Sequence, residues 1–259
     1  MDKLMEKKPV LHAVLWIMIY IVLVNIGDAL SEQMNTAHLA TSVLLLALSV
    51  VLVLYSKKSN RIALQGIQKT TKHDMRKTLF YIPLILLAFI QFAAGIDRSL
   101  SITEIAAACI LMIGTGFIEE VVFRGFLFQG ICGKSGVRKA ILISGITFGI
   151  GHIVNLLRGY DFAQMAGQIV VAIVVGIVLA LLVAVTKNLV PGILFHITFN
   201  LSGTITNPGS GMQTYVLIAI IAVAVPYAIY LLRFVQGEKQ AEKSVISANP
   251  MVADVSDIR

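Results

Sequence analysis

Two adjacent carboxylates, Glu119 and Glu120, lie in a stretch that is otherwise mostly apolar from Ile105 to Phe128. A charged side chain at the centre of a bilayer costs roughly 2.5–3.5 kcal/mol, and neighbouring carboxylates also repel each other. Residues of this kind usually face the interior of a helix bundle or a wet cavity, where they mark a function. A desolvated carboxylate is a better proton acceptor than a hydrated one, so the pair is a candidate for general base chemistry.

Arg124 lies four residues after Glu120, so both side chains share one face of a helix and are predicted to form an ion pair. Glu119 points about 100° away from Glu120 around the helix axis. The two carboxylates therefore cannot do the same work. We expect Arg124 to neutralise Glu120, which leaves Glu119 for a cavity.

Two later apolar segments carry polar side chains with the same spacing. Phe148 precedes His152 by four residues, and His196 precedes Asn200 by four, so each couple shares a helix face. Taken alone, His152 could be a buried histidine that bonds a backbone carbonyl. His196 and Asn200 could equally link neighbouring helices. Their place in successive apolar segments after the glutamates favours one shared polar site.

The elements that must position these residues are membrane-spanning helices. The chain has 259 residues, 57% hydrophobic and 14% charged, with a mean hydropathy of +0.86. A soluble domain is nearer a quarter charged, and a bilayer span needs about 20 apolar residues. The sequence therefore predicts an all-α, polytopic membrane protein with a polar intramembrane site. We expect about eight spans, at 10–30, 38–55, 78–96, 102–131, 139–157, 163–186, 189–206 and 213–233.

Charge patterning gives these spans an orientation. Lys and Arg gather near the N-terminus, in 56–77, in 134–139, at Lys187 and after 232, whereas the opposite loops hold Arg98 and Arg158. The positive-inside rule then predicts that both termini are cytoplasmic. The same clustering accounts for the net charge of +7 and indicates no nucleic-acid partner.

The span boundaries also define one domain and one tail. Residues 1–237 are predicted to form a single transmembrane domain with its catalytic core at about 102–206. The polar segment 238–259 has few aromatic residues and is predicted to be a disordered cytoplasmic tail.

Helical rise predicts how deep the polar residues lie. At 1.5 Å per residue from the cytoplasmic ends of their spans, Glu119 lies roughly 18 Å deep and His152 roughly 20 Å deep. His196 lies roughly 10 Å deep. These depths favour one site near the midplane that opens to the cytoplasmic half.

The ordered pattern Glu119-Glu120-x-x-x-Arg124, then Phe148-x-x-x-His152, then His196-x-x-x-Asn200 resembles the three motifs of the CPBP family. This family comprises the CAAX proteases and bacteriocin-processing enzymes, is also called Abi, and includes the type II CAAX prenyl endopeptidases. The resemblance covers about 119–200. It implies an eight-helix intramembrane endopeptidase with a glutamate-dependent mechanism and no metal or other cofactor.

The resemblance also implies a role for each residue. Glu119, with His152, would activate a water for attack on a peptide carbonyl. His196 and Asn200 would stabilise the oxyanion. Glu120, Arg124 and Phe148 would support the geometry of the site.

The substrate is expected to be a peptide or the tail of a membrane-associated protein, and the protein is expected to lie in a lipid bilayer. The short termini and compact loops suggest the membrane of a prokaryotic cell.

Two other interpretations of the polar site stay open at this point. Two histidines and a glutamate are an accepted zinc set, although no H-E-x-x-H motif is present and the histidines fall on different spans. Buried Glu, Arg and His also build proton relays, so a non-proteolytic immunity, scaffold or transport protein of the same fold is the alternative function.

Overall fold

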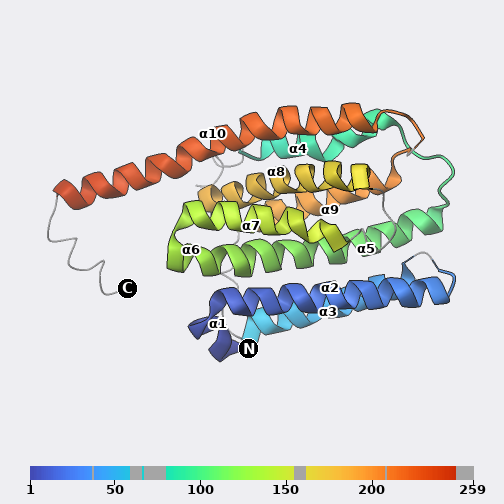
Figure 1. The fold of residues 1–259 in the computed structure, drawn as a ribbon, viewed down its shortest axis with the longest axis horizontal. Coiled ribbons are helices and arrows are strands. Elements are labelled where there is room, and N and C mark those ends of the chain that lie inside the picture. The colour runs from blue at the N-terminus through green and yellow to red at the C-terminus, as the bar shows by residue number, and fades with distance from the viewer. Residues whose placement is uncertain (37, 59–65, 67–79, 155–161, 208, 249–259) are drawn as a thin grey trace.

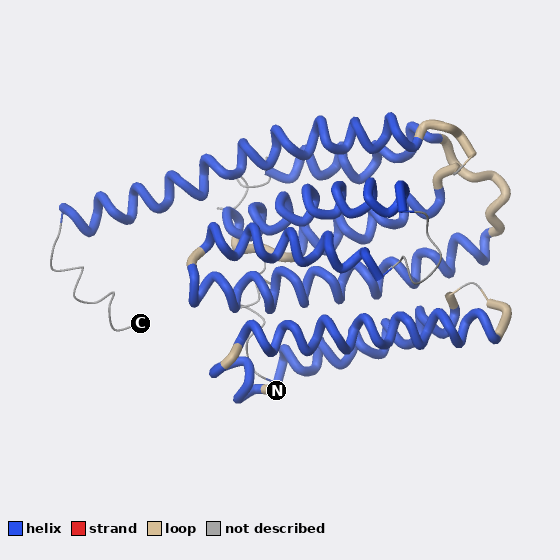
Figure 2. Tube along the Cα trace, in the orientation of Figure 1, coloured by secondary structure: helices blue, strands red, loops and turns tan. Residues whose placement is uncertain are grey.

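The fold is all-α, as the sequence predicts (Figures 1 and 2). The computed structural model describes the chain except for residues 37, 59–65, 67–79, 155–161, 208 and 249–259. Within these described ranges, extended pairing is limited to an isolated bridge between Ile96 and Thr206. The elements are α1 Asp2–Lys7, α2 Pro9–Gln33, α3 Leu39–Lys58, α4 Ile82–Phe89, the 3₁₀ helix η2 Ile90–Ala94, α5 Ile102–Glu120, the π-helix η3 Val121–Phe128, α6 Gln129–Ser135, α7 Val137–Gly151, α8 Phe162–Thr186, α9 Val190–Ile205 and α10 Gln213–Ala248.

Six of the eight predicted spans are helices long and apolar enough to cross a membrane, so the protein is a multi-pass membrane protein. The other two predicted spans, 78–96 and 189–206, hold the shorter apolar helices Ile82–Ala94 and Val190–Ile205. At 1.5 Å per residue, the 16 residues of α9 reach only roughly 24 Å. Helix α9 starts at Val190 with Pro191 in its first turn, and an extended Thr206 ends it, so the local backbone fixes this short length.

The helices pack in layers (Figure 1). The α2–α3 hairpin forms one outer layer and packs on α5 and η3. The long helix α5–η3–α6 and helix α7 come next, followed by α8 and α9. Helices α4 and α10 pack against each other and cover α9 and α8 on the far side. The middle of the long helix is therefore enclosed by protein on two sides.

The long helix that carries the glutamates has clear start and stop signals. Ser101 caps its N-terminus in a capping box, in which the Ser101 side chain accepts from the Glu104 N–H and the Glu104 carboxylate accepts from the Ser101 N–H. The helix runs for 34 residues, from Ile102 to Ser135. Gly136, with a φ of +83°, then reverses the chain into α7.

The last residues of helix α10 overlap the first part of the predicted tail, 238–259. Helix α10 continues through Ala248, beyond the boundary predicted at residue 237. The segment 238–248 is rich in Glu, Lys, Gln and Ala, which are strong helix formers, so a helix that has already started continues through it. The rest of the predicted tail lies outside the described residues.

Helices α7 and α8 approach closely at Gly149. A Cβ atom added there would lie 2.7 Å from the backbone nitrogen of Ile173 on α8, which is closer than packed atoms allow. Small residues give this kind of backbone contact between helices in membranes. The approach places Phe148, the neighbour of Gly149, against α8 near Gly176.

We therefore predict that Gly149→Ala lowers the thermal stability of the protein in mild detergent. The added methyl group meets backbone that cannot move without separating the two helices, and overpacking of this kind costs about 1–3 kcal/mol. Gly151→Ala on the same helix is the matched control, because a Cβ atom there meets nothing within 4 Å. The control should leave stability unchanged or raise it by about 0.5–1 kcal/mol. Equal melting temperatures for both variants would contradict the proposed close packing.

Candidate active site

A π-helical turn begins directly after the two glutamates. Residues Val121–Phe128 form η3 inside an otherwise α-helical span, and all eight are buried. π-helical turns are rare and frequently occur at functional sites. Ser144 on α7 donates a hydrogen bond to the carbonyl oxygen of Phe123 within this turn (2.9 Å). The turn is therefore supported from outside its own helix.

The predicted ion pair between Glu120 and Arg124 is present and completely buried. Arg124 Nη1 donates to Glu120 Oε1 at 2.7 Å, and both side chains have no exposed surface. Arg124 Nη2 donates to the carbonyl oxygen of Gly176 on α8 (3.2 Å). The guanidinium also lies over the ring of Phe148, 4.4 Å from its centroid, as a cation–π contact. Arg124 thus joins the long helix to α7 and α8.

His196 on α9 lies between the two glutamates. Its Nδ1 is 2.9 Å from Glu120 Oε1, and its Nε2 is 3.1 Å from Glu119 Oε2. The second contact has ion-pair distance but not hydrogen-bond direction, so Glu119 Oε2 is buried without a directed donor. An imidazole can donate from both nitrogens only as the imidazolium, in which case its charge and that of Arg124 balance the two carboxylates.

Gly116 explains how α9 comes so near the glutamates. A Cβ atom added to Gly116 would lie 2.9 Å from the backbone nitrogen of Ile197, the neighbour of His196. Gly116 is one turn before Glu119 on α5, so the lack of a side chain there lets the two backbones meet beside the carboxylates.

The ring of Phe148 lies at the centre of the cluster. Its centroid is 5.4 Å from the ring of His152 and 5.4 Å from the ring of His196, with edge-to-face geometry in both cases. His152 follows the last residue of α7 and lies within electrostatic range of Glu119 and His196. The structure therefore brings both histidines to one aromatic ring.

Of the predicted residues, Asn200 is the one with no described side-chain contact to the cluster. It lies one turn after His196 on α9, and its backbone carbonyl accepts a hydrogen bond from Thr204. The other six predicted residues lie within one network of contacts. What each does in a reaction stays a prediction.

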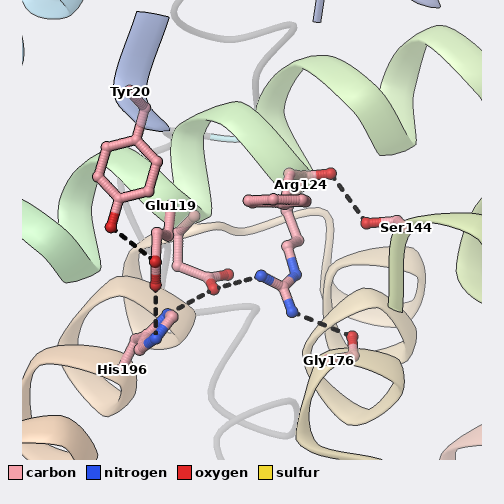
Figure 3. Close-up of polar contacts among 8 residues, drawn as sticks. Tyr20, Glu119, Arg124, Ser144, Gly176 and His196 are labelled. Carbon is pink, nitrogen blue, oxygen red and sulfur yellow. Dashed lines mark hydrogen bonds and ion pairs between the residues drawn. The ribbon is translucent and has the colours of Figure 1, made fainter. Parts of the chain in front are cut away.

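Tyr20 is a site residue that sequence reasoning missed. Its hydroxyl donates a hydrogen bond to Glu119 Oε1 at 2.7 Å, and Figure 3 shows Tyr20 and His196 on two sides of this carboxylate. Tyr20 lies in the middle of the apolar helix α2. A tyrosine in the middle of a span, away from the interfaces where Tyr is common, is a weak signal for an internal polar partner.

The arrangement of histidine and carboxylate side chains is relevant to whether the site could bind zinc. In the described part of the chain, no three His, Cys, Asp or Glu side chains are arranged so that they could hold a metal ion. Both nitrogens of His196 face carboxylates. A metal-independent site remains a prediction.

We predict that Arg124→Gln destabilises the protein by about 3–5 kcal/mol, because it leaves Glu120 buried without its cation. The double variant Glu120→Gln with Arg124→Gln should be less destabilised than the sum of the single variants, since both charges leave together. Thermal unfolding in detergent measures all three, and Arg138→Gln, at an exposed position, is the matched control. Strict additivity of the single variants would show that the pair contributes no coupling.

The comparison with known families falls on this part of the chain. Residues 101–202 match the family described as type II CAAX prenyl endopeptidase Rce1-like. No curated protein and no solved structure matches the chain. The matched segment begins at the Ser101 cap of α5, ends within α9 and contains all seven residues predicted for the site, whereas Tyr20 lies outside it. The segment 101–202 is thus similar to the type II CAAX prenyl endopeptidases, the group that its three ordered motifs also resemble.

Proposed function

We propose that the protein is an intramembrane endopeptidase that hydrolyses a peptide bond in a peptide or in the tail of a membrane-associated protein. The observation that carries this proposal is the environment of Glu119, which is 8% exposed in the middle of a membrane-length helix. Glu120 is matched to Arg124, whereas Glu119 contacts the neutral hydroxyl of Tyr20 and the ring of His196. A carboxylate in this setting is suited to take a proton from water.

In the proposed reaction, Glu119 accepts a proton from a water molecule as the water oxygen bonds to the carbonyl carbon of the substrate. The resulting tetrahedral intermediate carries a negative oxygen. Glu119 then returns the proton to the amide nitrogen as the carbon–nitrogen bond breaks, which yields a carboxylic acid and an amine. The electrostatic interaction of His152 with Glu119 supports a role beside Glu119 in activating the water.

His196 and Asn200 are proposed to stabilise the oxyanion. In the structure His196 Nε2 faces Glu119 Oε2, so it must leave that contact to donate to a substrate oxygen. Its other nitrogen, held by Glu120, would keep the ring in place during this change. One donor to an oxyanion contributes about 2.7–4 kcal/mol to the stability of the transition state.

The family match also guides the choice of substrate. Its description names prenyl endopeptidases, so prenylated C-terminal peptides are the first class to assay, together with the same peptides without the lipid. We propose a prokaryotic cell membrane as the location, with both termini cytoplasmic and the site open to the cytoplasmic half. The clustered Lys and Arg residues of alternate loops support this orientation.

We predict that Glu119→Gln abolishes peptide cleavage by the purified protein in lipid vesicles. Loss of a general base lowers turnover by about 10²–10⁴-fold, and the amide keeps the size of the side chain. His152→Ala and His196→Ala should also remove activity. Cleavage is measured by mass spectrometry of prenylated and unmodified peptides.

Glu104→Gln is the matched control, because Glu104 is exposed on the same helix and a glutamine can retain its capping contact. It should keep wild-type turnover. Full activity of Glu119→Gln would remove Glu119 from the mechanism, and equal inactivity of all proteins would favour the non-proteolytic alternative. A chelator arm completes the assay: activity lost on chelation and restored by zinc would favour a metalloprotease.

The proposed orientation is tested with single cysteines introduced into a variant without Cys109 and Cys132. A cysteine at position 3 and one at position 233 should react with a membrane-impermeant reagent from the cytoplasmic side of oriented vesicles. A cysteine at position 98 should react from the opposite side and is the matched control. Labelling of positions 3 and 233 from the outside alone would invert the topology.

A further inference from the structure

Tyr20 gives Glu119 a partner from outside the segment that matches the family. The hydroxyl of Tyr20 on α2 donates to Glu119 Oε1 at 2.7 Å, across 99 positions of sequence. The family match begins only at residue 101. The carboxylate at the centre of the proposed chemistry is therefore held in part by the N-terminal hairpin α2–α3.

The two oxygens of Glu119 have different partners. Oε1 accepts the Tyr20 hydrogen bond, whereas Oε2 faces His196 Nε2 at 3.1 Å (Figure 3). The last torsion of a glutamate side chain is broad and roughly two-fold, so a carboxylate held at one oxygen alone can rotate. Contacts at both oxygens fix the plane of the group and distinguish one oxygen from the other.

Helix α2 is itself anchored beside the glutamates. Trp16, one turn before Tyr20, donates through Nε1 to Nε2 of the fully buried His12 (3.0 Å). The ring of His12 packs edge-to-face on Phe126 of the π-helical turn, with 4.9 Å between centroids. The hairpin is thus fixed to the same turn that follows Glu120, and Tyr20 has a rigid base from which to reach Glu119.

We propose that Tyr20 is a positioning residue for peptide hydrolysis, which holds Oε1 of Glu119 so that Oε2 is the oxygen that takes the proton from water. The inference rests on the endopeptidase function proposed above. It assigns the α2–α3 hairpin a part in the reaction in addition to its part in packing. Because Tyr20 acts through Glu119, its loss affects turnover and leaves substrate binding intact.

The test compares Tyr20→Phe with Tyr55→Phe in the full-length protein in lipid vesicles. Tyr55 lies in the same hairpin, and its hydroxyl contacts His12 (3.0 Å), about two helical turns before Tyr20 on α2, so Tyr55→Phe is the matched control for the loss of an internal phenol. Loss of a hydrogen bond to a charged group predicts that Tyr20→Phe lowers kcat roughly 10- to 100-fold. KM should stay within about two-fold, and the melting temperature should fall no more than that of Tyr55→Phe, which keeps its kcat.

The outcomes distinguish a failure of the Tyr20 inference from a failure of the proposed endopeptidase function. An active wild type, an inactive Glu119→Gln and a Tyr20→Phe variant with wild-type kcat would overturn the role of Tyr20 and leave the endopeptidase in place. A rise in KM alone would also overturn it, because Tyr20 would then act on substrate binding. An equal fall of kcat in Tyr55→Phe would also overturn it, because the effect of Tyr20→Phe would then reflect packing of the hairpin and not the contact with Glu119. Identical behaviour of wild type and Glu119→Gln would overturn both proposals.

Discussion

The site depends on the ion pair between Glu120 and Arg124, because a carboxylate pair cannot be kept at the middle of a membrane span without a cation. Arg124 neutralises Glu120 and also makes two further contacts. Its second amino group donates to the carbonyl oxygen of Gly176, and its guanidinium lies over the ring of Phe148. These contacts join the long helix to α7 and α8. His196 then bonds the same oxygen of Glu120 and is brought to Glu119. The arrangement around Glu119 is thus built outward from one buried pair.

Sequence reasoning recovered the fold class and the ion pair because both depend on local pattern. Long apolar runs can be satisfied in a bilayer only as helices or closed barrels, and four-residue spacing alone places Glu120 against Arg124. Helical rise along separate spans predicts similar depths for Glu119 and His152, but it does not predict that His152 and His196 contact one aromatic ring. The family match covers the same residues, since all of them lie within 101–202.

The features that escaped prediction are those that depend on tertiary contact. Tyr20 looks like one more aromatic residue in an apolar helix, and its partner is decided by how the hairpin packs. The π-helical turn leaves no mark in residue type, because its support comes from Ser144 on another helix. The extent of α10 is also hard to predict, because the polar composition of 238–248 is compatible with a disordered tail and equally with a helix that continues from a span.

The two short helices have a consequence for the surrounding lipid. The apolar segment Ile82–Ala94 packs against α9, so these two shorter apolar helices adjoin each other, next to the helix that carries the glutamates. Leu194 on α9 and Ile85 on α4 are each 60% exposed, as expected of lipid contacts. The hydrocarbon core of a typical bilayer, about 30 Å thick, exceeds the length of these helices. Hydrophobic mismatch of this kind is relieved by local thinning of the membrane or by snorkelling of flanking residues. Thinning on this side shortens the path that a polar peptide backbone must travel from water to the carboxylates.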